Sequence, residues 1–173
     1  MSHLSQAHRF RIESLGPRHV RQDFSCGIEA LDNYLHRQAK QDVKKHAAAV
    51  FVLTPDGTTV AGYYTLSQFS VELDALPQEI ARKLPKYPVV PATLIGRLAV
   101  STAFRGQRLG ELLFMDALKR CLLASREIAS IAVIVDAKDE AAAAFYKKYG
   151  FLELPRIPTR LFLPIATIDR LFA

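Results

Sequence analysis

The sequence predicts an α/β protein built on a mixed β-sheet. Two observations support this: a hairpin pattern lies between residues 49 and 66, and strand patterns alternate with helix patterns from residue 94 to residue 163. Such alternation is typical of a sheet whose faces are covered by helices. The 173 residues contain no repeat, low-complexity tract or Gly/Ser linker. We therefore expect a single domain over residues 1–173.

The first part of the chain is expected to form a basic helix followed by the hairpin. Residues 32–45 lack Gly and Pro and place apolar residues at helical spacing, with Arg and Lys among the polar positions. Residues 49–53 and 59–66 are rich in residues that favour strands. The Pro-Asp-Gly sequence at residues 55–57 is a turn signal, so we expect these two strands to pair in an antiparallel hairpin.

Strand and helix patterns then follow one another. Four prolines punctuate residues 77–91, and a short helix is expected over residues 78–84. Further strands are expected over residues 94–100, 131–135 and 159–163, and further helices over residues 109–123 and 140–149. Gly150 is expected to end the last helix in a left-handed conformation, with Phe151 folded back on its final turn.

Composition limits the kinds of partner. The formal net charge of +6 and the pI near 9.5 favour polyanions such as nucleic acid or a nucleotide cofactor. Cys26 and Cys121 lie far apart, without His or Cys at metal-ligand spacing, so we expect two buried thiols and neither a metal site nor a disulfide framework. The chain shows neither an apolar signal region nor a run of about 18 apolar residues, so we expect a cytoplasmic protein that does not span a membrane.

A turn rich in Arg and Gly connects the strand over residues 94–100 to the next helix. Its residues, named here the Arg-Gly turn, are Arg105, Gly106, Gln107, Arg108, Leu109 and Gly110. A loop that becomes a helix offers unpaired N–H groups and a positive helix end, which suit a phosphate-bearing cofactor. No Gly-Lys-Ser/Thr triplet follows, and the requirements of a dinucleotide fingerprint, a third Gly and an acidic residue after the next strand in a doubly wound unit, are not met together, so both of those nucleotide sites are excluded.

The combination of this turn with Phe145-Tyr146 and Gly150-Phe151 resembles the GNAT superfamily of acetyl-CoA-dependent N-acetyltransferases. The cofactor motif of that superfamily is Arg/Gln-x-x-Gly-x-Gly/Ala, and a later helix often begins with Phe-Tyr and closes on Gly-Phe. The resemblance extends over residues 24–163. It is closer to the acetyltransferase toxins of bacterial toxin–antitoxin pairs, through the sequences at residues 24–27, 31–35, 62–66, 96–100 and 160–164.

The resemblance implies a GNAT fold with a mixed, mostly antiparallel sheet of about six or seven strands, splayed at the cofactor site and flanked by helices. Backbone N–H groups of the splayed strand would pair with the pantetheine arm and stabilise the oxyanion. The implied partners are a second copy of the chain, in a homodimer, and a ribbon-helix-helix antitoxin that covers the basic surface. The implied acetyl-CoA site consists of Leu98, Ala99, Val100, Arg105, Gly106, Gln107, Arg108, Leu109, Gly110, Glu111 and Phe145.

Arg108 stands where the motif usually has its first Gly. Either the turn holds Arg108 in a strained backbone state, or Arg108 adopts an ordinary helical state and its guanidinium contacts phosphate. We expect the second, because Gly106 and Gly110 still provide room for the cofactor.

Tyr146 is expected, from its position in the motif, to protonate the departing thiolate. Thiol and phenol pKa values of roughly 8.5 and 10 allow this proton transfer at modest cost. The alternative is a core aromatic residue. Phe145 and Tyr149 are four residues apart and share a helix face, whereas Tyr146 is offset by about 100° and is expected to point elsewhere.

The general base stays open. A reactive α-amine, with a pKa near 8, needs only desolvation and a water chain to lose its proton. Asp136 and Glu140 could assist, but carboxylates at strand ends and helix starts are more often caps. The five histidines precede the first expected strand, and none is a natural partner for Tyr146: they are His3, His8, His19, His36 and His46.

In the toxin branch, the substrate is the α-amine of an amino acid esterified to tRNA, and its acetylation stops translation. Arg97 lies inside an apolar strand, where its charge must face a cleft, a partner or an internal ion pair. Two alternatives remain open: acetylation of a small-molecule or protein amine, and a module that binds coenzyme A without turnover. The cations that could contact tRNA phosphates are Arg97, Lys40, Lys44, Lys45, Arg82, Lys83 and Lys86.

Overall fold

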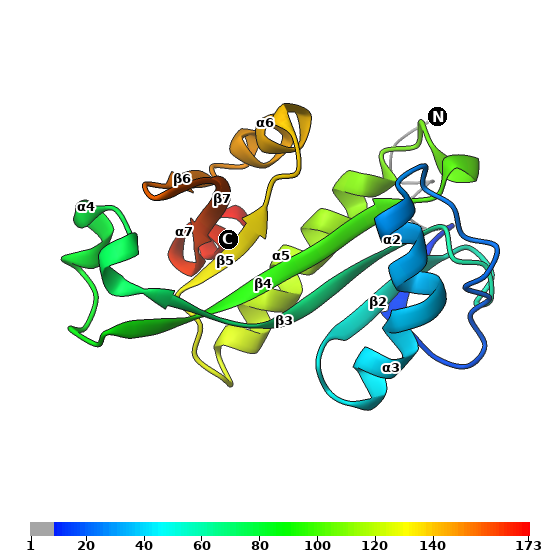
Figure 1. Ribbon diagram of the computed structural model, residues 1–173, viewed down its shortest axis with the longest axis horizontal. Helices are drawn as coiled ribbons and strands as arrows, with labels where there is room; N and C mark the ends of the chain where they lie inside the picture. Colours follow the sequence, from blue (N-terminus) through cyan, green and yellow to red (C-terminus); the bar gives the residue numbers. More distant parts are fainter. Residues whose placement is uncertain (1–8) are drawn as a thin grey trace. The chain divides into compact units, whose positions relative to one another are not determined.

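The computed structural model describes residues 9–173, and its strands form a seven-stranded sheet of order β1-β2-β3-β4-β5-β7-β6 (Figure 1). Strands β4 and β5 pair in parallel, whereas the pairs β1–β2, β2–β3, β5–β7 and β6–β7 are antiparallel. The predicted mixed, mostly antiparallel sheet is confirmed. The strands are β1 (Arg11–Ser14), β2 (Ala49–Thr54), β3 (Gly62–Glu72), β4 (Val89–Val100), β5 (Ala132–Asp136), β6 (Leu152–Leu154) and β7 (Ile157–Pro164).

Helices occur between the strands, so the predicted alternation is also confirmed. The α-helices are α2 (Glu29–Asn33), α3 (Ala39–Lys44), α4 (Gln78–Ala81), α5 (Leu109–Ser125), α6 (Glu140–Lys148) and α7 (Ile165–Leu171). The shorter turns are the π-helical η1 (Tyr34–Gln38) and the 3₁₀ turns η2 (Leu73–Ala75) and η3 (Thr102–Phe104).

The described chain groups into two compact units. Unit 1 lies within Met1–Ser67 and Gly96–Ala117, and unit 2 comprises Gln68–Ile95 and Leu118–Ala173. Strands β3 and β4 and helix α5 contribute residues to both units. The expectation of one domain over residues 1–173 stays a prediction.

Unit 1 has helices on both faces of its strands. Val52 of β2 and Tyr63 of β3 pack in one core with Leu35 of η1. Side chains of successive strand residues point to opposite faces. On the opposite face from Tyr63, the Tyr64 hydroxyl donates a hydrogen bond to Asp116 of α5 at 2.6 Å. The first half of α5 therefore covers the face opposite to the η1 segment.

Unit 2 has its own core. Ile134 of β5 and Phe162 of β7 pack there with Val90 and Ala92 of β4. Partly buried side chains of η2 and α4 pack against this cluster. The register Ile134↔Phe162 places these two residues opposite each other in the β5–β7 pair.

The prediction of one regular helix over residues 32–45 is wrong, both in where the helix begins and in its regularity. Helix α2 begins at Glu29, and the π-helical turn η1 separates it from α3. A π turn changes which backbone carbonyls find partners within the helix. Here Arg21 donates to the carbonyls of Leu35 and His36 at 3.1 and 3.2 Å, and Gln22 donates to the latter at 3.1 Å.

Several strand and helix limits also differ from those expected. Strand β3 begins at Gly62 instead of residue 59, because residues 56–59 form a side-chain-bonded turn, and it continues to Glu72. Strand β4 begins at Val89 and includes the exposed Pro91, whose carbonyl accepts a hydrogen bond from Ile131 at 2.9 Å. Helix α4 ends at Ala81, and the chain continues in tighter turns whose hydrogen bonds join residues three apart. Elements β1, β6 and α7 were not expected.

The C-terminal cap of α6 is confirmed. Gly150 has φ = 98°, and its N–H donates to the carbonyl of Lys147 at 3.0 Å. The N–H of Phe151 donates to the carbonyl of Tyr146 at 3.4 Å. These are the two hydrogen bonds of a Schellman motif.

Gly62→Ala is expected to lower the free energy of unfolding by about 1–3 kcal/mol, since overpacked sites cost about this much. A Cβ there would lie 2.7 Å from Leu113 Cδ1 and 2.9 Å from the carbonyl oxygen of Ala99, and the backbone oxygen cannot move aside freely. Urea unfolding measures the change. The matched control is Gly110→Ala, where the nearest atom is Val100 Cγ2 at 3.9 Å and no loss is expected. Equal losses in both variants would contradict this account.

Candidate functional site

The Arg-Gly turn lies between β4 and α5, as predicted. Beyond the end of β4, the Ser101 N–H donates to the carbonyl of Ala61 at 2.8 Å, and the 3₁₀ turn η3 follows. Gly106 then has φ = 81° and no heavy atom within 4 Å of the place where a Cβ would lie. Its backbone is therefore open to a ligand. Leu109, which is buried, begins α5.

The end of β4 extends past its pairing with β5. That parallel pairing runs from Thr93↔Val133 to Ile95↔Val135, whereas β4 continues to Val100. Ala99 is buried in the unit 1 core. Leu98 and Val100 are half-buried. This early end of the pairing agrees with the expected splay, and a cofactor role for the N–H groups of residues 98–100 stays a prediction.

The expected helical state of Arg108 is wrong. Arg108 has φ = 57°, in the left-handed region, although its carbonyl already accepts a helical hydrogen bond from Leu112 at 3.2 Å. A left-handed conformation costs a residue with a Cβ about 1–2 kcal/mol. The left-handed backbone at this position therefore favours Gly, but this chain has an exposed Arg there.

The side chains of Arg105 and Gln107 contact the protein itself. A guanidinium nitrogen of Arg105 donates to the carbonyl of Cys26 at 2.5 Å. Gln107 donates to the carbonyl of Phe104 at 3.4 Å. Glu111 is half-buried in the first turn of α5. Arg105 therefore ties the Arg-Gly turn to residue 26, a role that the sequence did not indicate.

Tyr146 lies in α6 within an aromatic cluster. Its ring centre is 5.5 Å from that of Phe145 and 5.7 Å from that of Phe151, and Phe145 also contacts Tyr149 at 5.5 Å. The expected contact of Phe145 with Tyr149 is confirmed, but Tyr146 joins this cluster instead of pointing away from it. Burial raises the pKa of the Tyr146 phenol. Tyr146 belongs to unit 2 and the Arg-Gly turn to unit 1, and their joint action stays a prediction.

Of the two acidic candidates, Asp136 has a structural partner and Glu140 is exposed. Arg160 donates to both carboxylate oxygens of Asp136, at 2.8 and 3.3 Å. Glu140 is exposed in the first turn of α6, whose N-cap is Asp139. The ion pair agrees with a structural role for Asp136, and the general base stays open.

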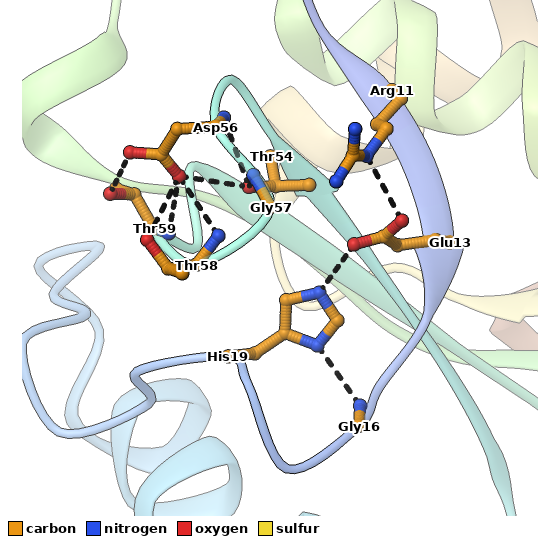
Figure 2. Close-up of polar contacts among 9 residues, drawn as sticks. All are labelled: Arg11, Glu13, Gly16, His19, Thr54, Asp56, Gly57, Thr58 and Thr59. Carbon is orange, nitrogen blue, oxygen red and sulfur yellow. Dashed lines mark hydrogen bonds and ion pairs between the residues drawn. The ribbon is translucent and has the colours of Figure 1, made fainter.

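The histidine positions need a correction. His19, His36 and His46 follow β1, because that short edge strand was not expected, while His3 and His8 lie outside the described residues. His19 is buried. Its Nδ1 accepts from the Gly16 N–H at 2.9 Å, so its Nε2 carries the proton and donates to Glu13 at 2.7 Å (Figure 2). This hydrogen bond lowers the pKa of the Glu13 carboxyl.

The other half of Figure 2 shows the Asp56 turn, which closes the β2–β3 hairpin. The Asp56 carboxylate accepts from the N–H groups of Thr58 and Thr59 at 2.9 and 2.7 Å. These bonds hold the pKa of Asp56 far below its usual range. Gly57 has φ = 86°, and its N–H donates to the Thr54 hydroxyl at 2.9 Å. The expected antiparallel hairpin is confirmed by the register Val52↔Tyr63.

The predicted tRNA-contacting cations divide between the units. In unit 1, Lys40, Lys44 and Lys45 line a surface hollow of about 510 Å³, named here the basic hollow, whose lining contains no carboxylate. In unit 2, Arg82, Lys83 and Lys86 are exposed. Arg21 and Arg37 also line the basic hollow and were not among the predicted tRNA contacts, although Arg37 follows the i, i+3 and i+7 spacing with Lys40 and Lys44. The full lining is Arg21, His36, Arg37, Lys40, Gln41, Lys44 and Lys45.

Arg97 packs on an aromatic ring. Its guanidinium carbon lies 3.6 Å from the ring centre of Tyr34, a cation–π geometry. The Tyr34 hydroxyl donates to Asp42 at 2.8 Å. Desolvation, together with this hydrogen bond, raises the pKa of Tyr34 to about 12.

Both cysteines are buried, as expected. Within residues 9–173, no group of three or more His, Cys, Asp or Glu side chains could hold a metal ion. Among the described helices, none has the length and apolar character needed to cross a membrane.

The Arg-Gly turn leads from a strand of a mixed sheet to the N-terminal end of α5, an arrangement suited to a phosphate-bearing group. Residues 17–151 match the Acetyltransferase (GNAT) family, and the chain belongs to this family.

Two curated relatives match most of the chain. The probable toxin TacT of Sinorhizobium fredii (strain NBRC 101917 / NGR234) is 36% identical over 169 residues, which cover 92% of this chain and 93% of the relative. The tRNA-acetylating toxin of Mycobacterium tuberculosis (strain ATCC 25618 / H37Rv) is 36% identical over 140 residues, which cover 81% of this chain and 82% of the relative.

Solved structures share the fold. AtaT complexed with acetyl-methionyl-tRNAfMet matches with a TM-score of 0.88 and 30% identity, over 95% of this chain and 99% of that chain. A mutant AtaT toxin bound to the C-terminus of the antitoxin AtaR and to acetyl-CoA matches with a TM-score of 0.80 and 26% identity, over 95% and 99% of the two chains. The predicted GNAT fold and its likeness to acetyltransferase toxins are confirmed.

Arg108→Gly is expected to raise the free energy of unfolding by about 0.5–1 kcal/mol, because the relief of the left-handed strain, about 1–2 kcal/mol, exceeds the entropic cost of Gly, about 0.4–1 kcal/mol. Urea unfolding measures this gain. Arg108→Ala keeps the strain and removes the charge, and it should leave stability unchanged. A less stable Arg108→Gly variant would show that the guanidinium stabilises the turn.

Proposed function

We propose that this protein is a toxin that transfers the acetyl group of acetyl-CoA to the α-amine of an amino acid esterified to tRNA and thereby blocks translation. The observation that carries the proposal is the match, over most of the chain, to tRNA-acetylating toxins, together with an Arg-Gly turn of suitable geometry. The alternatives are acetylation of a small-molecule or protein amine and coenzyme A binding without turnover.

The Arg-Gly turn would hold the phosphates of acetyl-CoA. Gly106 is open to a ligand, and the exposed Arg108 lies at the N-terminal end of α5, where the helix dipole attracts anions. Gln107, Leu109, Gly110 and Glu111 complete this part of the proposed site. Residues 98–100 would pair with the pantetheine arm and, through their N–H groups, stabilise negative charge on the carbonyl oxygen. Phe145 would contact the cofactor beside Tyr146.

Tyr146 would act as the general acid. Acetyl-CoA supplies a thioester: the amine nitrogen bonds to its carbonyl carbon, and the carbon–sulfur bond breaks. The Tyr146 phenol gives its proton to the departing sulfur, and the attacking amine loses a proton to water. Since burial raises its pKa, the phenol stays protonated at neutral pH and is ready to donate.

The basic hollow is the proposed place for tRNA phosphates. Its lining holds five cations and no carboxylate, so a phosphate there meets positive charge from several side chains. Lys86, by contrast, shares a hollow with Glu72 and Asp74. We therefore assign the main tRNA contact to Lys40, Lys44 and Lys45, and a lesser contact to Arg82, Lys83 and Lys86.

The proposed partners follow from the same relatives. An antitoxin, of the ribbon-helix-helix type, would bind with its C-terminal segment, as AtaR does on AtaT. The active toxin would be a homodimer. We propose a cytoplasmic location, because the proposed substrate is charged tRNA.

Tyr146→Phe is expected to slow acetyl transfer by about 10²–10⁴-fold, the range for loss of a general acid, while coenzyme A still binds. The assay incubates the protein with acetyl-labelled acetyl-CoA and total charged tRNA and counts labelled aminoacyl-tRNA. Because the Tyr146 pKa lies above its usual value near 10, the wild-type rate should not fall between about pH 7 and 9.

The controls separate the alternatives. Tyr149→Phe removes a phenol from the same aromatic cluster and should leave transfer unchanged. Unchanged turnover in Tyr146→Phe would refute the role of Tyr146. Label that appears on small amines and not on tRNA would refute the proposed substrate.

Lys40→Gln/Lys44→Gln/Lys45→Gln is expected to weaken tRNA binding and to reduce the slope of log K against log salt by up to about 2.7, since each lost phosphate contact removes about 0.9. Fluorescence anisotropy with labelled tRNA at several salt concentrations measures the slope. The matched variant Arg82→Gln/Lys83→Gln/Lys86→Gln removes the same charge and should change the slope less. An equal change in both variants would refute the assignment of the main tRNA contact to the basic hollow.

A further inference from the structure

Residues 25 and 26 connect the Arg-Gly turn to helix α2. The carbonyl of Ser25 accepts a hydrogen bond from the N–H of Thr102 at 2.8 Å. The carbonyl of Cys26 accepts the bond from Arg105 at 2.5 Å. Both donors precede the two left-handed residues of the turn, so the direction in which the turn begins depends on where these carbonyls lie.

Asp32 of α2 holds the same two residues from the other side. Its Oδ1 accepts from the Cys26 N–H at 2.8 Å, and its Oδ2 accepts from the Ser25 hydroxyl at 3.4 Å. The Cys26 N–H and the Ser25 carbonyl belong to one peptide unit. A continuous chain of hydrogen bonds therefore runs from Thr102 through this peptide to the Asp32 carboxylate, and each bond in such a chain polarises the next.

The neighbouring residues leave this peptide little freedom. Phe24 is buried, with its ring centre 5.4 Å from that of Tyr63, and its carbonyl accepts a hydrogen bond from His36 at 2.7 Å. Gly27 has φ = 85°, and a Cβ there would lie 3.2 Å from the Arg105 guanidinium. Gly27 thus allows the close approach of Arg105 to Cys26.

We propose that Asp32 is a positioning residue for the cofactor site: its carboxylate fixes the Ser25–Cys26 peptide, which in turn fixes Thr102 and Arg105 of the segment that binds acetyl-CoA. This inference rests on the proposed role of the Arg-Gly turn. Gly106 and Arg108 are left-handed, and Arg108 is strained, so a turn without fixed neighbours adopts other conformations. Coenzyme A must then order the turn as it binds, which lowers its affinity.

Asp32→Ala is expected to weaken coenzyme A binding by about tenfold or more, the usual effect of losing hydrogen bonds to a charged group. Isothermal titration calorimetry with coenzyme A measures this without any acceptor substrate. Because positioning acts on cofactor binding, the KM for acetyl-CoA should rise with little change in kcat. Amide hydrogen exchange should accelerate at residues 102–108.

The matched control is Asp56→Ala. Asp56 is also a turn-capping carboxylate of unit 1, but its hydrogen bonds hold Thr58 and Thr59 of the β2–β3 hairpin (Figure 2). It should lower the melting temperature and leave coenzyme A affinity within about twofold. If Asp56→Ala weakens coenzyme A binding as much as Asp32→Ala, general destabilisation explains both and the proposal is overturned.

Asp32→Asn keeps an acceptor for the Cys26 N–H but loses the charge, and charge-assisted hydrogen bonds are about twice as strong as neutral ones. We expect an intermediate loss of about threefold. This variant decides the matter if Asp32→Ala does not fold: unchanged affinity in Asp32→Asn would then overturn the proposal. A wild-type protein that binds coenzyme A but does not acetylate tRNA would refute the proposed substrate, while the ratio of affinities would still test Asp32.

Discussion

The backbone path from β4 into α5 is the constraint on which the proposed site depends. To change direction there, the chain adopts left-handed conformations at Gly106 and Arg108. Gly accepts this geometry without penalty, whereas Arg108 requires about 1–2 kcal/mol from its surroundings. Hydrogen bonds from Thr102 and Arg105 to residues 25 and 26 anchor the start of the turn, and the first helical bond of α5 anchors its end. The turn is thus held from outside its own sequence.

The helical segment of unit 1 carries the basic hollow and also the carboxylate of Asp42, which accepts a hydrogen bond from Tyr34. The pKa of Asp42 is lowered, first by its hydrogen bond from Gln38 and further by the charge of Lys45, which also lines the basic hollow, and the pKa of Tyr34 is raised. Near neutral pH, the Asp42 carboxyl is therefore ionised and the Tyr34 phenol is protonated. Arg97 stacks on the Tyr34 ring, and the Tyr34 hydroxyl already bonds to the Asp42 carboxylate. Cation–π packing, and not a simple ion pair, therefore orients the Arg97 side chain.

Local rules made some of this structure predictable. The hairpin and the Gly150 cap follow from turn chemistry within a few residues, and the Arg-Gly turn was recognisable from its motif. Strand β1 was missed because its sequence, Arg-Ile-Glu-Ser, has one apolar residue and is defined by its pairing with β2. The left-handed state of Arg108 was mispredicted, and the contacts of Thr102 and Arg105 to residues 25 and 26, which are distant in sequence, were not expected. Such contacts leave no periodic signal.

The Phe-Tyr sequence of α6 and the Gly-Phe sequence that follows this helix behave as one physical unit. Gly150 reverses the chain so that the Phe151 N–H reaches the carbonyl of Tyr146, and the same reversal brings the Phe151 ring against the Tyr146 ring. Phe145 contacts the Tyr146 ring as well. These aromatic neighbours exclude water and raise the phenol pKa, which keeps the proton on Tyr146. The spacing between the two dipeptides is therefore set by the helix cap, and the proposed acid depends on a glycine four residues away.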